Sequence, residues 1–195
     1  MMSQSDVTRI RFASVCPPAA ACHVAVRRYA PETLPPPHTH DFAEVFWIEQ
    51  GTGLHDHGGV ERRFGPGTLV FVAPEDVHAF AADSSRGFRI VNVAFPVPTW
   101  RYLVRRYLGR SGDWLAREAS ARTFALEPAE LEDVRRAARE LLDGGRDRFA
   151  LERFLMNLVH LVRDRAPVGA GQHIPPWLRH AAVRIERRHR LRAQP

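Results

Sequence analysis

Hydrophobic periodicity changes at Pro96, and this change limits the folds open to the chain. Between Arg9 and Phe95, apolar residues mostly alternate with polar ones or form short β-branched and aromatic runs, with Gly and Pro between them. Such a pattern is typical of β-strands. Beyond Pro96 the apolar residues recur every three or four positions, which is the spacing of amphipathic helices. The sequence therefore predicts a β-rich part followed by a helical part.

The β-rich part is expected to contain eight short strands. Gly58-Gly59 provides a two-residue hairpin turn between two of them. Regularly spaced short strands with such turns predict an antiparallel sandwich or barrel. The expected strands are Arg9–Ser14, His23–Ala30, Phe42–Gln50, Gly53–His57, Glu61–Phe64, Thr68–Ala73, Val77–Ala81 and Phe88–Phe95.

The helical part is expected to contain three amphipathic helices. The first has its apolar stripe between Trp100 and Leu108, the second runs from Pro128 to Gly144-Gly145, and the third follows after a short turn. The second and third helices therefore predict an antiparallel hairpin. A hairpin buries two wide stripes only partly, so the remaining apolar surface needs the barrel or a second copy of the chain. The positions expected to form a dimer interface are Leu151, Leu155, Leu158 and Val162.

The patterns divide the chain into four regions. Residues 1–96 are expected to form the barrel, 97–166 the linking helix and hairpin, 167–176 a Gly- and Pro-rich linker, and 177–195 the start of a further domain. The net charge of +6 is uneven, because residues 177–195 contain six Arg and one Glu, a net of +5. The rest of the chain is nearly neutral. Clustered positive charge that could contact nucleic acid is therefore expected only in the last region.

Several classes of protein and site are disfavoured by the composition. No apolar run is long enough to span a membrane and no signal peptide is recognisable, so we expect a cytoplasmic protein without a membrane partner. Cys16 and Cys22 are the only cysteines and form no metal or redox motif, which favours structural roles. Phosphate loops, nucleophile elbows and cysteine nucleophile sites are not recognisable either.

Four polar residues form the sharpest candidate site. His38 and His40 share one face of a strand, and Glu44 has the same parity. His78 follows later, in the stretch Pro74-Glu75-Asp76-Val77-His78. Imidazoles and a carboxylate that converge inside a barrel suit a divalent transition metal. A straight strand would carry Glu44 about 13 Å beyond His40, so a bend near Phe42 is required.

These residues resemble the two motifs of the cupin family. His38-x-His40-x-x-x-Glu44, followed by Gly51, is similar to the first cupin motif, and the stretch from Gly67 to His78 is similar to the second. The resemblance implies a cupin barrel in which His38, His40, Glu44 and His78 would hold Zn, Ni, Fe or Mn. Pro35-Pro36-Pro37 replaces the usual upstream Gly, and the second motif lacks its usual Gly and terminal Asn. These departures weigh against enzymatic activity more than against the fold.

The same residues have an alternative role that needs no metal. The histidines and the carboxylate could hydrogen-bond to a ligand or to one another, and in either case they line the cavity. A second pair, His55 and His57, lies beside the Gly-Gly turn and is expected at an exposed hairpin end.

Aromatic and basic residues complete the expected ligand site. The aromatic side chains expected in the pocket are Phe42, Phe46, Phe71 and Phe80, with Trp47 on the opposite parity of its strand. Stacking faces beside polar groups suit a sugar. Arg89 and Arg27 could pair with an anionic substituent, although both could equally be surface residues.

The order of the regions resembles the AraC family of transcription regulators along nearly the whole chain. Barrel, linking helix, helical hairpin, Pro-rich linker and an Arg-rich helix opening at Pro175-Pro176-Trp177 follow one another as in that family. The resemblance implies a cupin barrel that binds a small-molecule effector, most simply a sugar, and a hairpin that forms a homodimer. DNA would be bound only through a helix-turn-helix domain of which this chain contains the first residues, so we expect no sequence-specific DNA binding from it.

Two other functions remain open at this stage. One is a metal-dependent cupin enzyme, such as a dioxygenase or an isomerase, with His38, His40, Glu44 and His78 around an ion. The other is a sugar-binding module without regulatory output. An enzyme has no use for a linker that leads into a basic helix, so the pattern favours the regulator. Whether it activates or represses transcription does not follow from the sequence.

Overall fold

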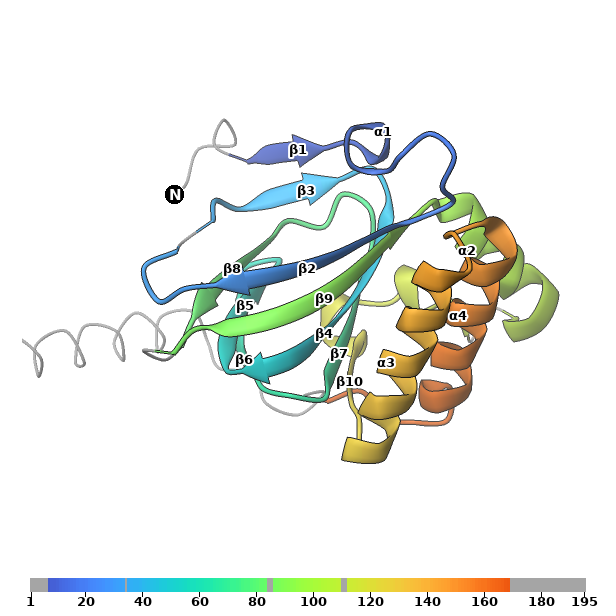
Figure 1. Ribbon diagram of the computed structural model, residues 1–195. Helices are drawn as coiled ribbons and strands as arrows, with labels where there is room; N and C mark the ends of the chain where they lie inside the picture. The colour runs from blue at the N-terminus through green and yellow to red at the C-terminus, as the bar shows by residue number, and fades with distance from the viewer. Residues whose placement is uncertain (1–6, 34, 84–85, 110–111, 169–195) are drawn as a thin grey trace, which may run out of the picture.

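Two five-stranded sheets face each other, and helices cover one of them from outside (Figure 1). The computed structural model describes residues 7–33, 35–83, 86–109 and 112–168. In spatial order, the first sheet consists of β1 (Thr8–Ile10), β3 (His38–His40), β8 (His78–Ala82), β5 (Gly53–His57) and β6 (Val60–Phe64). The second sheet consists of β10 (Thr123–Ala125), β7 (Thr68–Val72), β4 (Ala43–Gly51), β9 (Phe88–Phe95) and β2 (His23–Tyr29). Adjacent strands are antiparallel except β1 and β3, which run parallel.

The helical elements follow the barrel in the order that the sequence predicts. They are α2 (Val97–Leu103), the π-helical turn η2 (Val104–Leu108), the 3₁₀ turns η4 (Trp114–Ala116) and η5 (Ala119–Ala121), α3 (Pro128–Asp143) and α4 (Arg148–Val162). Glu127 and Glu130 form a capping box at the start of α3, and the Asp147 side chain accepts a hydrogen bond from the Ala150 amide at the start of α4. These caps explain why the hairpin helices begin where they do.

The predicted strands agree with the structure to within a few residues, except for the first strand, Arg9–Ser14. Two three-residue strands, β3 and β10, are additional. Gly53–His57 and Phe88–Phe95 have the predicted bounds, but Arg9–Ser14 is wrong because β1 ends at Ile10 and α1 (Phe12–Val15) follows. The Asp41 carboxylate accepts a hydrogen bond from the Phe12 amide at 2.7 Å, and this contact favours the turn into α1. The three-residue strands β3 and β10 are too short to produce a periodic signal of their own.

Alternation along the second sheet creates two separate apolar clusters. Side chains that point between the sheets form an inner cluster, which includes Phe46, Ile48, Phe80 and Phe88. Side chains of opposite parity form an outer cluster with the helices, which includes Trp47, Phe71, Trp100 and Trp114. The prediction of Phe71 as a pocket aromatic is therefore wrong. Its ring centroid lies 5.2 Å from that of Trp114, on the helix-covered face.

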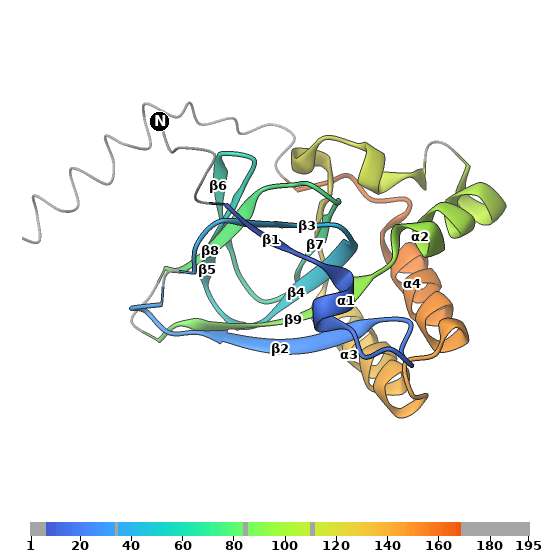
Figure 2. The same cartoon turned by 90° about the horizontal axis from the view of Figure 1, so that it is seen from above.

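The hairpin residues predicted to form a dimer interface are buried within the protomer. The side chains of Leu151, Leu155, Leu158 and Val162 are fully buried and belong to the outer cluster, between α3, α4 and the second sheet. That prediction is corrected: the apolar stripe of α4 packs on its own barrel. Figure 2 shows α3 and α4 lying together beyond the end of the barrel formed by β2, β9 and β4.

Gly51 shows why the cupin-like motif ends on glycine. This residue has a φ of +77°, a conformation that side chains with a Cβ disfavour. A Cβ there would also lie 2.9 Å from the Phe88 Cα on the neighbouring strand. The close approach of β4 and β9 at their ends therefore requires glycine.

No helix among the described residues is long and apolar enough to cross a bilayer. The predicted linker 167–176 and region 177–195 lie outside the described residues apart from Pro167 and Val168.

Candidate ligand-binding site

A cavity of about 280 Å³ lies between the two sheets. It is lined from six strands, with β1, β3 and β8 on one side and β2, β4 and β9 on the other, and Figure 2 shows this arrangement from above. The lining residues are Thr8, Ile10, Val15, His23, Ala25, Arg27, Tyr29, Pro35, Pro36, His38, His40, Phe42, Glu44, Phe80, Asn92 and Ala94. Its volume is at the small end of ligand pockets, so it suits a compact ligand.

Five of the eight predicted ligand-binding residues line this cavity: His38, His40, Phe42, Glu44 and Phe80. The chain crosses from the first sheet to the second at Asp41 and Phe42, between the end of β3 and the start of β4. This crossing is the bend that the spacing requires, and it places Glu44 on the wall opposite the two histidines.

Three predicted ligand-binding residues lie elsewhere. Phe46 is fully buried in the inner cluster, 5.1 Å by ring centroid from Phe80. His78 is buried behind the lining residues, with its ring centroid 4.2 Å from that of His38. Arg89 points to the opposite face of the second sheet, where its nearest carboxylate oxygen, on Glu49, is 4.0 Å away. The predictions of Phe46 and His78 fail because period two gives the parity of a side chain but not its depth in the barrel. The prediction of Arg89 fails because its parity on β9 is the outward one.

Four cavity residues from β2 and β9 add polar groups to the site. Three of them were not predicted, and Arg27 was predicted only as a possible partner for an anionic substituent. His23, Arg27 and Tyr29 alternate along β2, and Asn92 lies on β9. Arg27 is the basic residue that the sequence offers for an anionic substituent. His23, Tyr29 and Asn92 share the parity of the cavity-facing residues on their strands, and this is the signal that could have found them.

The histidines form one cluster across the first sheet. His55 Nε2 and His78 Nδ1 are 3.2 Å apart, and the ring of His78 also meets the rings of His38 and His40, with centroids 4.2 and 5.3 Å away. His57 and His55 are buried with exposed fractions of 7% and 1%, so the prediction of an exposed hairpin end is wrong. β5 lies between β6 and β8, and the parity of these two residues points them into the barrel.

Burial keeps the imidazoles of His38, His40, His55 and His78 uncharged at neutral pH. Desolvation lowers the pKa of His40 to about 4, against which the hydrogen bond with the Phe42 carbonyl acts only partly. Desolvation also lowers the pKa of His38, and it lowers the pKa of His55 and His78 well below the usual histidine value. Neutral imidazoles present one donor and one acceptor each.

The pKa of Glu44, on the facing wall, is shifted upward and not downward. Burial raises the pKa of this carboxyl to about 7, while a hydrogen bond from Asn92 and the charge of Arg27 act to lower it. Near neutral pH the group can therefore accept a hydrogen bond as a carboxylate or donate one as an acid. A hydroxyl group, which both donates and accepts, complements either state.

A buried ion pair connects the histidine cluster to the segment that precedes α3. Asp76 Oδ2 is 2.8 Å from His57 Nε2 and 2.5 Å from Arg122 Nη1. Burial acts to raise the pKa of Asp76, but hydrogen bonds from His57 and Arg122 outweigh it and lower the pKa to about 2. The pair thus stays ionised and fixes the loop before β8 against the segment before β10.

Several buried polar atoms near the cavity have no hydrogen-bond partner among the described residues. They are His23 Nδ1, His40 Nε2, His78 Nε2 and Asn92 Oδ1. His40 Nδ1 lies 2.7 Å from the Phe42 carbonyl oxygen and must donate to it, so the free Nε2 is an acceptor. Buried polar atoms are nearly always paired in folded proteins, so unpaired atoms on a cavity wall indicate a ligand or water.

The residues implied for a metal do not gather around one point. Among the described residues, no group of three or more His, Cys, Asp or Glu side chains is placed to hold an ion. Glu44 accepts a hydrogen bond from Asn92 on its own sheet, and His78 Nδ1 is engaged with His55. The site predicted from His38, His40, Glu44 and His78 is therefore not supported as a metal centre. His38, His40 and Glu44 are better described as part of a polar cavity wall.

The family model for the AraC-like ligand binding domain matches residues 23–159 of this chain. The chain belongs to this family. The match covers the cavity strands from β2 onward, the linking helix and nearly all of the hairpin, so the effector-binding assignment rests on the same residues that build the site.

Individual proteins are similar to parts of the AraC-like chain. The HTH-type transcriptional activator RhaS of Yersinia pestis (strain Pestoides F) is 32% identical over 100 residues, which is 51% of this chain and 34% of the activator. The chain spans about a third of the length of the curated relatives it matches. ToxT from Vibrio cholerae has a similar fold, with a TM-score of 0.50, 10% identity, and coverage of 80% of this chain and 61% of ToxT. A cupin barrel protein from Salinispora arenicola matches 46% of this chain and 75% of its own, with 19% identity and a TM-score of 0.39.

The AraC-like chain is thus an effector-sensing domain, with a cupin-like barrel and a helical hairpin. Its curated relatives are transcriptional activators, so the enzyme alternative from the sequence is not supported.

Proposed function

We propose that the cavity binds a small, uncharged, hydroxyl-rich effector such as a monosaccharide. The observation that carries this proposal is the set of buried polar atoms without partners on the cavity wall, namely His40 Nε2, Asn92 Oδ1 and His23 Nδ1. Glu44 adds a group that donates or accepts, and the rings of Phe42, Tyr29 and Phe80 add apolar faces. Few charges and many directional groups match a polyol better than an ion.

Calorimetric titration of a panel of neutral monosaccharides and their uronic acids tests this proposal. At least one neutral sugar should bind, and the matching uronic acid should bind less tightly because Glu44 faces its carboxylate. Asn92→Leu should weaken the binding of that sugar at least tenfold, since a buried donor and acceptor are lost. Asn157→Leu, which removes an exposed amide on α4, is the matched control and should leave affinity unchanged. Equal affinity in both variants would contradict the proposal.

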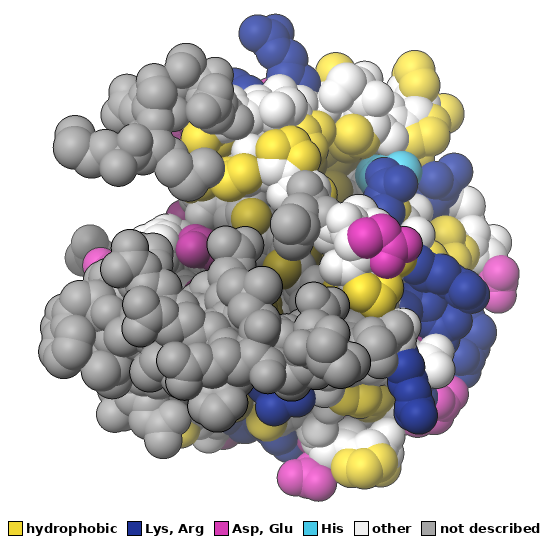
Figure 3. Space-filling view, turned by 90° about the vertical axis from the view of Figure 1, so that its left-hand side faces the viewer, with side chains coloured by type: hydrophobic (Ala, Val, Ile, Leu, Met, Phe, Trp, Pro, Cys, Tyr) yellow, Lys and Arg dark blue, Asp and Glu magenta, His cyan; other side chains and the backbone are white. Residues whose placement is uncertain are grey.

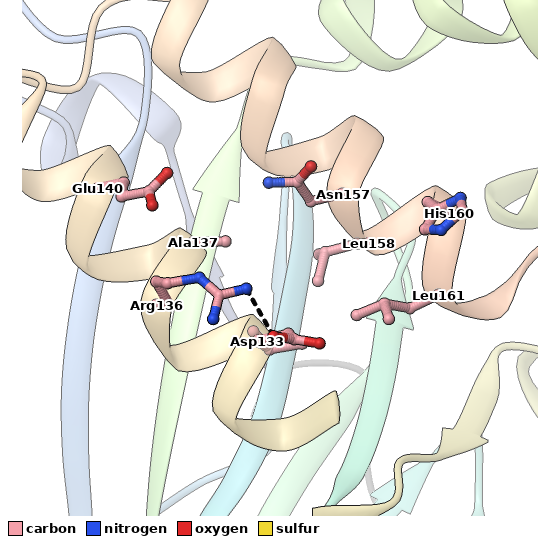
Figure 4. Close-up of a pocket in the computed structure, with 9 residues that line it drawn as sticks. Asp133, Arg136, Ala137, Glu140, Asn157, Leu158, His160 and Leu161 are labelled. Atoms are coloured by element: carbon pink, nitrogen blue, oxygen red, sulfur yellow. Dashed lines mark hydrogen bonds and ion pairs between the residues drawn. The ribbon is translucent and has the colours of Figure 1, made fainter. Parts of the chain in front are cut away.

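We also infer that the protein is a homodimer through the outward side of the hairpin. A hollow of about 170 Å³ lies between α3 and α4, and Figure 4 shows that Asp133, Arg136 and Glu140 line it from α3, opposite Asn157, His160 and Leu161 on α4. Arg136 pairs with Asp133, and Arg153 pairs with Glu140. Charges of both signs on one surface suit a two-fold interface, in which each patch meets its own copy.

Sedimentation of a Leu161→Glu variant tests the dimer. The partly exposed Leu161 lies on the outward side, so a new charge there should shift the mass from dimer to monomer. Leu142→Glu, at an exposed position at the end of α3 and outside this hollow, is the control and should leave the mass unchanged. A monomeric parent protein, or a dimer that survives Leu161→Glu, would contradict the inference.

The proposed regulator acts on DNA in the cytoplasm through residues outside the effector domain. Its relative RhaS is named as an HTH-type activator, and the family match ends at residue 159. The effector domain supplies sensing and dimerisation in this proposal, and the choice between activation and repression would depend on the DNA-binding part. Gel-shift titration should show that this chain binds operator and random DNA alike, and a preference for one sequence would contradict this division of roles.

A further inference from the structure

A second hollow, of about 360 Å³, lies on the outer face of the second sheet, where α3 leaves part of β2 and β9 uncovered. It is separated from the barrel cavity by the sheet itself. The lining residues are Val24, Val26, Trp47, Glu49, Arg89, Val91, Arg135, Ala138, Arg139 and Leu142. We call it the outer groove.

One end of the outer groove is an apolar ladder. Val24 pairs with Val93 and Val26 pairs with Val91 across β2 and β9, so their side chains share the outward face. Val26 is 60% exposed and Leu142, at the end of α3, is 47% exposed. Large apolar side chains this exposed on facing elements mark a binding surface more often than a plain surface.

The other end of the outer groove is cationic. Arg28 pairs with Arg89 in the same ladder, which places two like charges directly across from each other. Glu49 is the nearest acid, but its carboxylate is already engaged by Trp47 Nε1 at 2.6 Å and Arg135 Nε at 2.9 Å. Arg89 Nη2 stays 4.0 Å from that carboxylate.

Arg89 is the guanidinium with spare hydrogen-bonding capacity in this groove. Its Nε is buried and has no hydrogen-bond partner among the described residues. Arg139, by contrast, donates to Glu132 at 2.9 Å, and Arg135 is held by Glu49 and Glu132. Four cations, Arg28, Arg89, Arg135 and Arg139, therefore meet two acids, Glu49 and Glu132, and the two net positive charges lie on Arg28 and Arg89.

We propose that the outer groove binds an amphiphilic anion, a carboxylate attached to an aliphatic chain. The chain would lie along the valine ladder, and the carboxylate would meet Arg89 and Arg28. From Val24 to Arg28 the strand extends about 13 Å, which accommodates a medium-length chain. An anion between Arg28 and Arg89 also relieves their mutual repulsion, and Arg presents a planar fork that matches a carboxylate.

Basic side chains lie on the same side of the molecule as the outer groove. β2, β9 and α3 face the viewer in Figure 1, and Figure 3 turns that front to its right-hand side. Basic side chains gather there, with hydrophobic ones beside them. A carboxylate is thus attracted to the same side on which apolar side chains are available.

Calorimetric titration with three probes tests the proposal on the intact chain. Octanoate has both chain and charge, 1-octanol has the chain alone, and acetate has the charge alone. Octanoate should bind at least tenfold more tightly than either of the others. Equal binding of octanoate and octanol would overturn the role of the arginines, and absence of octanoate binding would overturn the site.

Variants then locate the bound octanoate. Arg89→Gln and Val26→Asp should each weaken octanoate binding at least tenfold, whereas Arg101→Gln, at an exposed position on α2 outside both hollows, should not change it. Glu44→Gln, which alters only the barrel cavity, should also leave octanoate binding unchanged. Loss of binding in Glu44→Gln with full binding in Arg89→Gln would place octanoate in the barrel and overturn the proposal.

Sedimentation of Val26→Asp separates a ligand groove from a contact between copies of the chain. The proposal requires the same mass as the parent protein. A drop in mass would show that a second copy covers the outer groove and would overturn the assignment to a small ligand. The proposal is independent of the sugar site, because each site has its own probe and its own variants.

Discussion

Arg122 donates a hydrogen bond to Asp76 at 2.5 Å across a gap of 46 positions in the chain. The guanidinium is almost fully buried, and the same carboxylate contacts His57 and accepts a hydrogen bond from the Ala73 amide at 2.8 Å. A contact between the histidine cluster and the segment leading into α3 thus ties the effector cavity to the helical hairpin.

Breaking this pair should be costly. Arg122→Gln leaves a part-buried carboxylate without its cation, so we expect the free energy of unfolding to fall by about 1.5–3 kcal/mol in urea titrations. The double variant Asp76→Asn with Arg122→Gln should lose less than the two single variants together, because no charge is left unpaired. Arg9→Gln breaks an exposed pair with Glu75 and should cost less than about 1 kcal/mol. A similar small loss in Arg122→Gln would refute the role of the buried pair.

Leu155 should behave as a core residue. Its side chain is fully buried between α4, α3 and the second sheet. Leu155→Ala should therefore lower the free energy of unfolding by about 2–5 kcal/mol. The sedimentation mass of the folded variant should equal that of the parent. A monomeric variant with undiminished stability would instead restore the dimer interface that the sequence suggested.

Stability should fall on acidification. The pKa values of His38, His40, His55 and His78 are lowered by burial, that of His40 to about 4, so the unfolded chain takes up protons that the folded chain does not. Each such proton lowers the free energy of unfolding by about 1.4 kcal/mol per pH unit as the pH falls from about 6.5 toward 4. Urea titrations should show a loss of more than about 2 kcal/mol between pH 6.5 and 5. A flat profile over this range would contradict the buried, neutral cluster.

Glu44 should oppose this trend. Its pKa is raised to about 7, so the folded chain takes up this proton first, and stability rises as the pH falls from about 7 to about 4.5. Glu44→Gln removes the compensation, and the acid loss should become steeper in the same titrations. An unchanged loss in Glu44→Gln would mean that the carboxyl ionises normally in the folded protein.

Metal removal should have no effect on the fold. The candidate ligands do not converge on a shared point among the described residues, so no ion is needed to neutralise or order them. Protein purified without added metal should contain less than one ion per ten chains by elemental analysis. Its melting temperature should not change with a chelator. A stoichiometric ion whose removal lowers that temperature would reinstate the cupin metal site.

Much of the fold was open to prediction because local patterns decide it. Strands such as Gly53–His57 and Phe88–Phe95 show their period in the sequence, and α3 and α4 carry their start signals at Glu127 and Asp147. The cupin-like motif also placed three of the cavity residues, His38, His40 and Glu44, since a bend at Asp41 and Phe42 is the way to bring Glu44 opposite the two histidines.

The sequence alone determined most of the strands and helices, the apolar face of each helix, and the family that the motifs resemble. Only the tertiary structure decided the neighbours of each side chain. Leu155 packs on its own barrel, Phe46 lies in the inner cluster, and Arg89 lies outside the cavity. The physical reason is that periodicity reports one face of an element and is set by local geometry. The partner of that face and its depth depend on contacts between segments far apart in the chain, and no local pattern encodes them.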